Sequence, residues 1–273
     1  MGKPINGHDQ MNAANGETVL ITGASSGIGL ELARCFAVDK CRLVLAARNT
    51  EALQSLADEL HLEHGIQTMV LTADLSRPET PARVFNELQQ AGMTVDVLVN
   101  NAGFGAHGAF AGLPLRRQLE MIQLNIAALT ELTGLFLPGM LERKRGGVLN
   151  VGSLAGFVSG PGMAVYFATK AYVLSFTEAL AGELAGTGLT VTALCPGPTA
   201  TNFGNVARGS KERQFKSPKM PAETVARCGH RAFRKGRVLA IPGLQNHFLI
   251  FLMRITPRWF QRNIVKSLNR TKN

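Results

Sequence analysis

Short aliphatic runs alternate with longer helical patterns along most of this 273-residue chain. Strands that are apolar throughout, rather than at every second position, are typical of parallel sheets with helices on both faces. Parallel neighbours also need a crossover connection, which is usually a helix. The pattern therefore predicts the α/β class, with one doubly wound domain of about seven strands. The predicted strands are Val19–Thr22, Arg42–Ala46, Thr68–Leu71, Val95–Asn100, Gly147–Gly152, Thr190–Leu194 and Val238–Ile241.

The segments between these runs have the apolar spacing of helices. They predict helices over Gly27–Val38, Thr50–His64, Pro81–Gln90, Leu115–Leu141, Tyr166–Leu184 and Ala222–Lys235. We expect residues 1–16 to form a flexible N-terminal tail and residues 17–243 to form the α/β domain. Residues 244–273 are expected to form a C-terminal helical extension.

Composition narrows the class of protein further. Hydrophobic residues make up 45% of the chain and charged residues 18%, which is ordinary for a globular protein. The N-terminus lacks the apolar segment of a signal peptide, and the absence of a run of 18 apolar residues predicts no membrane-spanning helix. The cysteines have neither C-x-x-C nor zinc spacing, so we expect reduced thiols, no metal and a cytoplasmic protein. They are Cys35, Cys41, Cys195 and Cys228.

The stretch TGASSGIG, from Thr22 to Gly29, fits two patterns with different chemistry. G-x-S-x-G around Ser25 is the nucleophile elbow of α/β-hydrolases. Gly-x-x-x-Gly-x-Gly is related to the turns that hold a dinucleotide pyrophosphate at a helix N-terminus. The position after the first strand favours the dinucleotide turn. A hydrolase also needs a downstream acid and histidine, and only His107 falls near the carboxyl end of a predicted strand.

The second predicted strand continues into Ala47 and Arg48, without the acid that holds the adenosine ribose in NAD-binding folds. A small residue followed by arginine leaves room for a 2′-phosphate and offers it a bidentate partner. This pair predicts NADP(H) as the cofactor. The alternative is an Arg48 that is simply solvated at the surface.

A second group of residues carries reactive side chains. Tyr166 and Lys170 are four residues apart, on one face of a predicted helix. Ser153 follows the strand Gly147–Gly152, at the sheet edge where open α/β folds bind their ligands. The three side chains are therefore expected to lie near the glycine turn.

These motifs occur together in one order: TGASSGIG, the segment Asn100–Gly103 (NNAG), Ser153, Tyr166-x-x-x-Lys170 and Pro196-Gly197. In order and spacing they resemble the short-chain dehydrogenase/reductase family, over roughly residues 17–243. The resemblance implies a Rossmann sheet and an NADP(H)-dependent oxidoreductase that transfers hydride between nicotinamide and a carbonyl or hydroxyl group. It also implies a homodimer or homotetramer that pairs through its two long helices.

The resemblance further implies roles for single residues. Tyr166 is the general acid, and Lys170 lowers the pKa of Tyr166 and holds the nicotinamide ribose. Ser153 hydrogen-bonds the substrate oxygen, and Asn125 holds a water on the proton path to Lys170. The residues implied in cofactor binding are Gly23, Ser25, Ser26, Gly27, Ile28, Gly29, Arg48, Asp74, Leu75, Asn100, Ala102, Gly103, Tyr166, Lys170, Pro196, Gly197 and Thr199.

Two other functions stay open from the sequence. One is a dinucleotide-binding redox sensor or regulatory subunit without turnover, which has no need to combine Ser153, Tyr166 and Lys170. The other is the serine hydrolase that uses Ser25. For the oxidoreductase, we expect an apolar or lipid-like substrate beneath a mobile lid at 198–221. The aromatic residues expected to line its pocket are Phe104, Phe157, Phe203 and Phe215.

Positive charge is concentrated in the last quarter of the chain. Residues 208–273 hold 16 of the 29 Lys and Arg residues but only 2 of the 19 Asp and Glu residues. Past Pro257, one set of apolar and one set of basic residues each repeat every four positions, which predicts a basic amphipathic helix that contacts an anionic membrane. Packing on the body or on a partner subunit is the alternative. Nucleic acid is not an expected partner, because no recognition motif accompanies the charge. The two sets are Phe260, Ile264 and Leu268, and Arg258, Arg262, Lys266 and Arg270.

Overall fold

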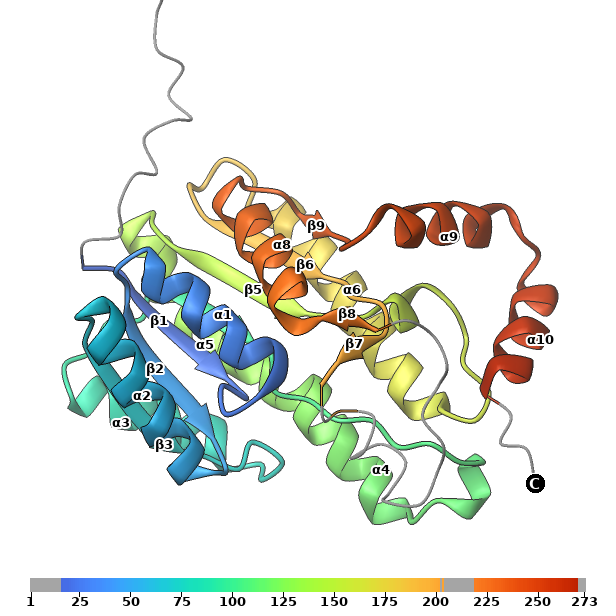
Figure 1. The fold of residues 1–273 in the computed structure, drawn as a ribbon, viewed down its shortest axis with the longest axis horizontal. Coiled ribbons are helices and arrows are strands. Elements are labelled where there is room, and N and C mark those ends of the chain that lie inside the picture. The colour runs from blue at the N-terminus through green and yellow to red at the C-terminus, as the bar shows by residue number, and fades with distance from the viewer. Residues whose placement is uncertain (1–15, 202, 204–218, 270–273) are drawn as a thin grey trace, which may run out of the picture.

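The computed structural model describes residues 16–201, 203 and 219–269. Within them, seven parallel strands form one sheet in the order β3-β2-β1-β4-β5-β6-β9. Helices cover both faces of the sheet (Figure 1), so the predicted doubly wound fold is confirmed. The strands are β1 Thr18–Thr22, β2 Arg42–Ala47, β3 Thr68–Thr72, β4 Val97–Asn100, β5 Gly147–Val151, β6 Thr190–Leu194 and β9 Leu239–Ala240.

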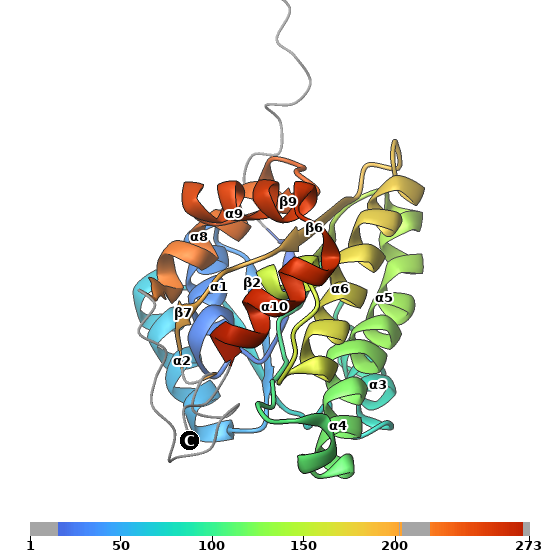
Figure 2. The ribbon, with the colours of Figure 1, turned by 90° about the vertical axis from the view of Figure 1, so that its right-hand side faces the viewer.

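The helices form two layers, which Figure 2 shows on either side of the sheet. Along β1, Val19 and Ile21 enter the core under one layer and Leu20 enters the core under the other. This alternation of two apolar sides explains why the strands have no polar face. One layer holds α1 Gly27–Val38, α2 Thr50–His64 and α8 Ala222–Arg234, and the other holds α3 Thr80–Gln90, α5 Leu129–Arg143 and α6 Ala164–Glu183.

Helix α2 begins and ends where its capping residues require. The Asn49 side chain accepts a hydrogen bond from the backbone N–H of Ala52 at 3.0 Å. At the other end Gly65 takes the left-handed conformation, with φ 66°, which suits a residue without Cβ. The N-cap therefore fixes where α2 begins, and Arg48 lies in the short connection between β2 and α2.

The predicted long helix at 115–141 is continuous but not regular. It consists of α4 Leu115–Ile122, the π-helical segment η2 Gln123–Ala128, and α5. Among the described residues it is the helix that is long and apolar enough to cross a membrane, by length and composition alone. Leu132, Phe136 and Met140 of α5 are buried in the core beneath the sheet. That burial is typical of a core helix in an α/β domain.

The C-terminal extension folds as two helices, α9 Leu244–Ile255 and α10 Arg258–Asn269. Two short strands, β7 Thr199–Ala200 and β8 Met220–Pro221, pair before them. The predicted tail lies outside the described residues apart from Gly16, and so does most of the predicted lid at 198–221. All four cysteines are free thiols, and the described residues contain no cluster of metal ligands.

Candidate active site

The reactive residues lie at the carboxyl ends of β4, β5 and β6. Ser153 follows β5 and starts the short helix η3 Leu154–Phe157, where its hydroxyl accepts a hydrogen bond from the Ala155 N–H at 3.1 Å. Helix η3 packs closely on α6, since a Cβ at Gly156 would lie 2.6 Å from the Lys170 carbonyl oxygen. This close packing brings Ser153 to the helix that carries Tyr166 and Lys170.

Tyr166 is 9% exposed, and its phenol is hydrogen-bonded to the Ser153 side chain. Burial raises the pKa of Tyr166 to about 12, and the bond to Ser153 only partly opposes that effect. The resemblance to the family instead implies that Lys170 lowers this pKa below its usual value. That implication is wrong for the protein alone, because the loss of hydration outweighs the hydrogen bond with Ser153. Tyr166 is consequently a neutral hydrogen-bond donor near pH 7.

Lys170 is 6% exposed and donates a hydrogen bond from Nζ to the Val151 carbonyl oxygen at 2.7 Å. Burial lowers the pKa of Lys170 to about 8, because a buried ammonium loses its hydration. The amine still carries its charge in most molecules at pH 7. Gly103 lies opposite it, and a Cβ there would approach Nζ to 3.7 Å.

Cys195 lies at the end of β6 beneath these side chains, whereas the sequence predicts it only as one of four reduced thiols. Burial raises the pKa of its thiol to about 12, although the Ser153 N–H and the Lys170 charge act against that rise. The thiol is therefore neutral and adds no negative charge beside Lys170. Its neighbour in the sequence, Pro196, accepts a hydrogen bond from the Leu154 N–H at 3.0 Å, which ties η3 to the end of β6.

Asn125 occupies the π-helical segment η2 and is buried. Its Nδ2 donates to the Phe104 carbonyl and to Thr169 Oγ1, both at 3.0 Å, and its Oδ1 accepts from the Phe104 N–H at 3.2 Å. Asn125 thus joins the loop after β4 to the turn of α6 between Tyr166 and Lys170. Irregular helical turns of this kind are frequent at functional sites. Thr169 was not among the predicted residues, because a threonine inside a helix gives no distinctive pattern.

The glycine turn follows β1, as predicted, and packs against the loop after β4. Gly23 and Gly27 have φ of 66° and 59°, which L side chains rarely adopt. A Cβ on Gly29 would lie 2.4 Å from both the Gly23 carbonyl oxygen and Asn101 Nδ2. Asn101 holds the turn by donating to the carbonyls of Thr22 and Gly23, at 2.8 and 3.2 Å. Sequence reasoning missed Asn101, although its place in NNAG marked it.

The start of α1 has the features of an anion-binding helix N-terminus. Ser26 is exposed at the N-cap, and its side chain makes no capping hydrogen bond to the helix. The first backbone N–H groups of α1 therefore lack a capping side chain, which suits a phosphate group. Ser25 is half-buried at the same turn, and Ile28 packs on the core beneath it.

Arg48 is exposed directly after β2, close enough to Asp74 for its charge to act on that carboxyl. Burial works to raise the pKa of Asp74, but hydrogen bonds from Ser76 and the charges of Arg48 and Arg77 hold it below its usual value. Asp74 is thus a carboxylate at the same sheet edge as Arg48. Leu75 instead points into the core.

Asn100 differs from the expectation for a cofactor-binding side chain. Its Nδ2 donates to Thr133 Oγ1 at 3.1 Å and to Asn150 Oδ1 at 3.0 Å, inside the core. Both amide hydrogens are used there, so the donors of this side chain are not available to a cofactor. Ala102 stays at the edge, and its N–H donates to Thr22 Oγ1. The sequence could not distinguish the two asparagines of NNAG.

The turn after β6 lies on the same side of the sheet. Thr199 Oγ1 donates to the Gly197 carbonyl oxygen at 2.9 Å. A Cβ on Gly197 would lie 3.0 Å from Nδ2 of Asn246, which belongs to the first turn of α9. The C-terminal extension therefore begins beside a predicted cofactor residue.

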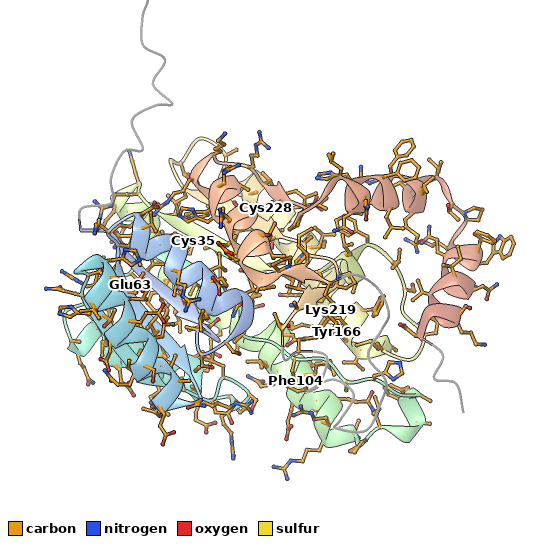
Figure 3. All side chains as sticks on the ribbon, viewed as in Figure 1. Cys35, Glu63, Phe104, Tyr166, Lys219 and Cys228 are labelled. Atoms are coloured by element: carbon orange, nitrogen blue, oxygen red, sulfur yellow. The ribbon has the colours of Figure 1, made fainter. Side chains whose placement is uncertain are left out.

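Apolar side chains surround Tyr166. Phe203 lies with its ring 5.3 Å from the tyrosine ring, and Phe104 belongs to the same cluster. Figure 3 shows Tyr166 and Phe104 at this end of the sheet. Phe157 packs instead with Ile250 of α9, and Phe215 lies outside the described residues. Two of the four predicted aromatic residues are thus brought to the reactive tyrosine.

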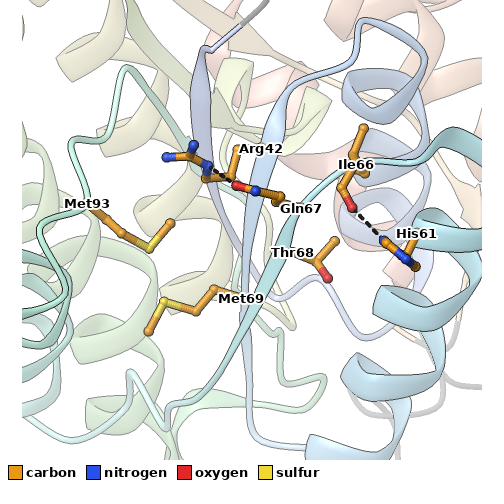
Figure 4. A pocket seen from close by; sticks show the side chains of 7 residues that line it. All are labelled: Arg42, His61, Ile66, Gln67, Thr68, Met69 and Met93. Atoms are coloured by element: carbon orange, nitrogen blue, oxygen red, sulfur yellow. Dashed lines mark hydrogen bonds between the residues drawn. The ribbon is translucent and has the colours of Figure 1, made fainter.

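The hydrolase alternative finds no support in this arrangement. Among the described residues, no histidine hydrogen-bonds Ser25; His61 and His230, for example, bond the Ile66 carbonyl and Asp39. A cavity of about 590 Å³ lies at the other end of the strands, beside the start of β2 and β3 (Figure 4). It holds no nucleophile and is remote from the reactive residues. Its lining residues are Arg42, His61, Ile66, Gln67, Thr68, Met69 and Met93.

Comparison with known proteins agrees with this geometry. The profile of the short chain dehydrogenase family matches residues 17–212, so the chain belongs to that family of oxidoreductases. It is 31% identical to the ketoacyl reductase HetN of a Nostoc species, over 80% of this chain and 77% of the relative. It is 34% identical to the NADP-dependent 3-hydroxy acid dehydrogenase of Schizosaccharomyces pombe, over 74% of this chain and 80% of the relative. A solved short-chain dehydrogenase from Sphingobium yanoikuyae, in complex with NADPH, is 33% identical and superposes with a TM-score of 0.78. The match covers 88% of this chain and 96% of that one.

Proposed function

We propose that this protein is an NADP(H)-dependent carbonyl reductase or alcohol dehydrogenase for an apolar, acyl-chain-like substrate. The observation that carries the proposal is the contact of Ser153, at the start of η3, with the neutral, buried Tyr166 of α6. Lys170 lies one turn further along the same helix. The names of the two relatives, a ketoacyl reductase and a 3-hydroxy acid dehydrogenase, support an acyl substrate. The solved NADPH complex supports the cofactor. Arg48, with no acid at the end of β2, supports NADP(H) over NAD(H).

The side chains divide the chemistry among them. Bound NADPH supplies the hydride for the carbonyl carbon. Tyr166 holds the proton for the carbonyl oxygen, since its raised pKa keeps the phenol neutral near pH 7. Ser153 donates to the oxygen atoms at which negative charge develops, and charged Lys170 stabilises the phenolate that remains. Asn125 and Thr169 keep the loop after β4 in register with α6.

The two tyrosines of the chain give a matched test. Tyr172 lies on another face of α6, where its hydroxyl bonds Thr130 at 2.7 Å. We expect Tyr166→Phe to lose at least about 100-fold in ketone reduction while still binding NADPH, because general acid catalysis is typically worth 10²–10⁴. Tyr172→Phe should keep most of the activity. NADPH binding by both variants without turnover by the wild type on any ketone or alcohol would instead favour the redox sensor.

The apolar lining predicts a dependence on chain length. Each buried CH₂ group contributes about 0.8 kcal/mol, or roughly fourfold in binding. A series of methyl ketones should therefore gain kcat/KM with each added carbon until the pocket is filled. Phe203→Ala should flatten that gain, because its ring lies against Tyr166. A series in which small polar ketones are preferred contradicts the apolar substrate.

We also propose a cytoplasmic homodimer or homotetramer. The four free cysteines fit a reducing compartment. Leu115, Leu119 and Ile122 are exposed on one face of α4, at positions i, i+4 and i+7, which suits a contact between copies. Sedimentation velocity should give a species larger than the 29.3 kDa chain, and Leu119→Asp should reduce it to the monomer. A wild type that sediments as a monomer at micromolar concentration contradicts this assembly.

A further inference from the structure

Helix α9 turns its apolar face away from the protein. Leu244, Phe248, Phe251, Leu252 and Ile255 are all exposed, with Leu244 at 87% and Phe251 at 59%. Their spacing of i, i+4, i+7, i+8 and i+11 places them on one face of the helix. A surface helix of a globular protein normally buries such a face.

The opposite side of α9 attaches the helix to the body. Ile250 is 6% exposed and packs in a cluster with Leu174 and Ile241, against which Leu154 of η3 also packs. Asn246 donates to the Pro242 carbonyl oxygen at 2.6 Å. The helix is therefore seated by its narrow buried side, and the broad apolar side has no partner among the described residues.

Helix α10 continues this surface beside the active site. Trp259 and Phe260 are exposed, and Val265 is buried. At its end Asn269 donates to the Pro161 carbonyl oxygen at 2.9 Å and accepts a bond from His107 Nε2 at 2.9 Å. Pro161 belongs to the turn before α6, so α10 spans from α9 to the loops around Tyr166 (Figure 2). Side chains project outward along both helices (Figure 3).

The charge of this region has one sign. The chain has no Asp or Glu after Glu223, and Arg254, Arg258, Arg262 and Lys266 are exposed on α9 and α10. His247, next to the apolar face of α9, lines a cavity of about 580 Å³ together with cations of α8 and the β9 connection. Those cations are Arg227, Arg231, Lys235 and Arg237. Cations flanking an exposed apolar face are typical of helices that lie in a membrane interface.

We propose that α9 and α10 are an interfacial element that docks this protein on an anionic lipid bilayer. The apolar face of α9 enters the boundary between headgroups and acyl chains, and the arginines lie at the lipid phosphates. A second copy of the chain fits this surface poorly, because two such faces would bring like charges together. Docked in this way, the protein holds the site beside a source of apolar substrate. That last step rests on the proposed function, whereas the docking does not.

Trp259 is the only tryptophan of the chain, so its emission reports on this surface alone. We expect the full-length protein to show a blue shift on vesicles with 30% phosphatidylserine, and quenching by lipids brominated on their acyl chains. On pure phosphatidylcholine we expect much weaker binding. The readout needs neither cofactor nor turnover, so a failed reductase assay leaves it unaffected. An emission spectrum that does not change at millimolar anionic lipid would overturn the proposal.

Matched variants test separately the apolar and the charged residues of this docking surface. Phe251→Ser should reduce vesicle affinity at least tenfold, whereas Leu62→Ser, at an exposed leucine of α2, should not change it. Arg258→Gln and Arg262→Gln should each lower affinity about fivefold, and Arg116→Gln on α4 should not. Equal binding to neutral and anionic vesicles, or a blue shift that appears with protein concentration alone, would also contradict docking on anionic lipid. The second result would assign the face to contact between copies.

Discussion

The amine of Lys170 lies 2.7 Å from the carbonyl oxygen of Val151, the last residue of β5. One of its three donors is therefore committed to the strand that leads into Ser153. This bond holds α6 against the sheet and directs the remaining donors toward the space beside Gly103. The lysine is thus both an anchor of the helix and the buried charge of the site.

The first prediction concerns the pH dependence of reduction. Lys170 must be charged to stabilise the Tyr166 phenolate, and burial lowers the pKa of Lys170 to about 8. Its charge is present below that pH and is lost above it. We therefore expect kcat/KM for ketone reduction to be level from pH 6 to 7.5 and to fall above an apparent pKa near 8. A level profile up to pH 10, measured with saturating NADPH, contradicts the role of Lys170.

The second prediction uses the same pKa to test stability. The usual lysine pKa is 10.5, so between about pH 8 and 10.5 the unfolded chain binds more protons than the folded one. Stability conferred by this group must then rise with pH. Relative to Lys170→Met, the wild type should gain about 2 kcal/mol in free energy of unfolding from pH 7 to pH 10. Urea titrations at both pH values measure the gain, and parallel curves for the two proteins contradict it.

The third prediction concerns the choice of cofactor. Arg48 is exposed after β2, where we place the 2′-phosphate. Arg48→Ala should weaken NADPH about 10–100-fold and leave NADH nearly unchanged, because hydrogen bonds to charged groups contribute about 1.5–3 kcal/mol. Arg77→Ala is the control, because the charges of both arginines lower the pKa of Asp74 but only Arg48 follows β2. Calorimetric titration with each nucleotide measures the ratio. Equal losses for the two nucleotides would assign Arg48 a general electrostatic role.

The fourth prediction compares two helical glycines. A Cβ on Gly29 would lie 2.4 Å from the Gly23 carbonyl oxygen, whereas a Cβ on Gly182 would meet nothing within 4 Å. We expect Gly29→Ala to lose cofactor binding and about 1–3 kcal/mol of stability through overpacking. Gly182→Ala should instead stabilise the protein slightly, since alanine is the better helix former. Thermal unfolding with and without NADPH checks both, and a Gly29→Ala variant that binds NADPH normally would be incompatible with this account of the turn.

Local signals explain how much of the fold was predictable from sequence. The predicted bounds of α1 and α2 agree with the structure, because a glycine turn, the Asn49 cap and Gly65 define their ends. The parallel sheet was predictable because its strands are apolar on both sides. The last strand proved shorter than predicted, at Leu239–Ala240, since it lies at the sheet edge with a single neighbour.

The site was less predictable where long-range contacts decide. Asn100 and Asn101 are adjacent in sequence, yet one side chain enters the core and the other holds the glycine turn. No spacing rule distinguishes them, because Asn100 is the last residue of β4 and Asn101 is the first residue of the loop that follows it. The direction of the Tyr166 pKa likewise depends on how completely the folded chain removes water from the phenol. The sequence predicted a helical extension over residues 244–273, but the face that α9 leaves exposed depends on where Ile250 packs.

The bonds that Asn269 makes with Pro161 and His107 join the end of α10 to loops on either side of the site. If occupation of the site shifts the Pro161 turn, the affinity of the C-terminal helices for whatever they contact must change by some factor. Linkage then requires that the same contact change the affinity of the site by that factor. In that case the active site and the C-terminal helices share one equilibrium, and binding at either one reports on the other.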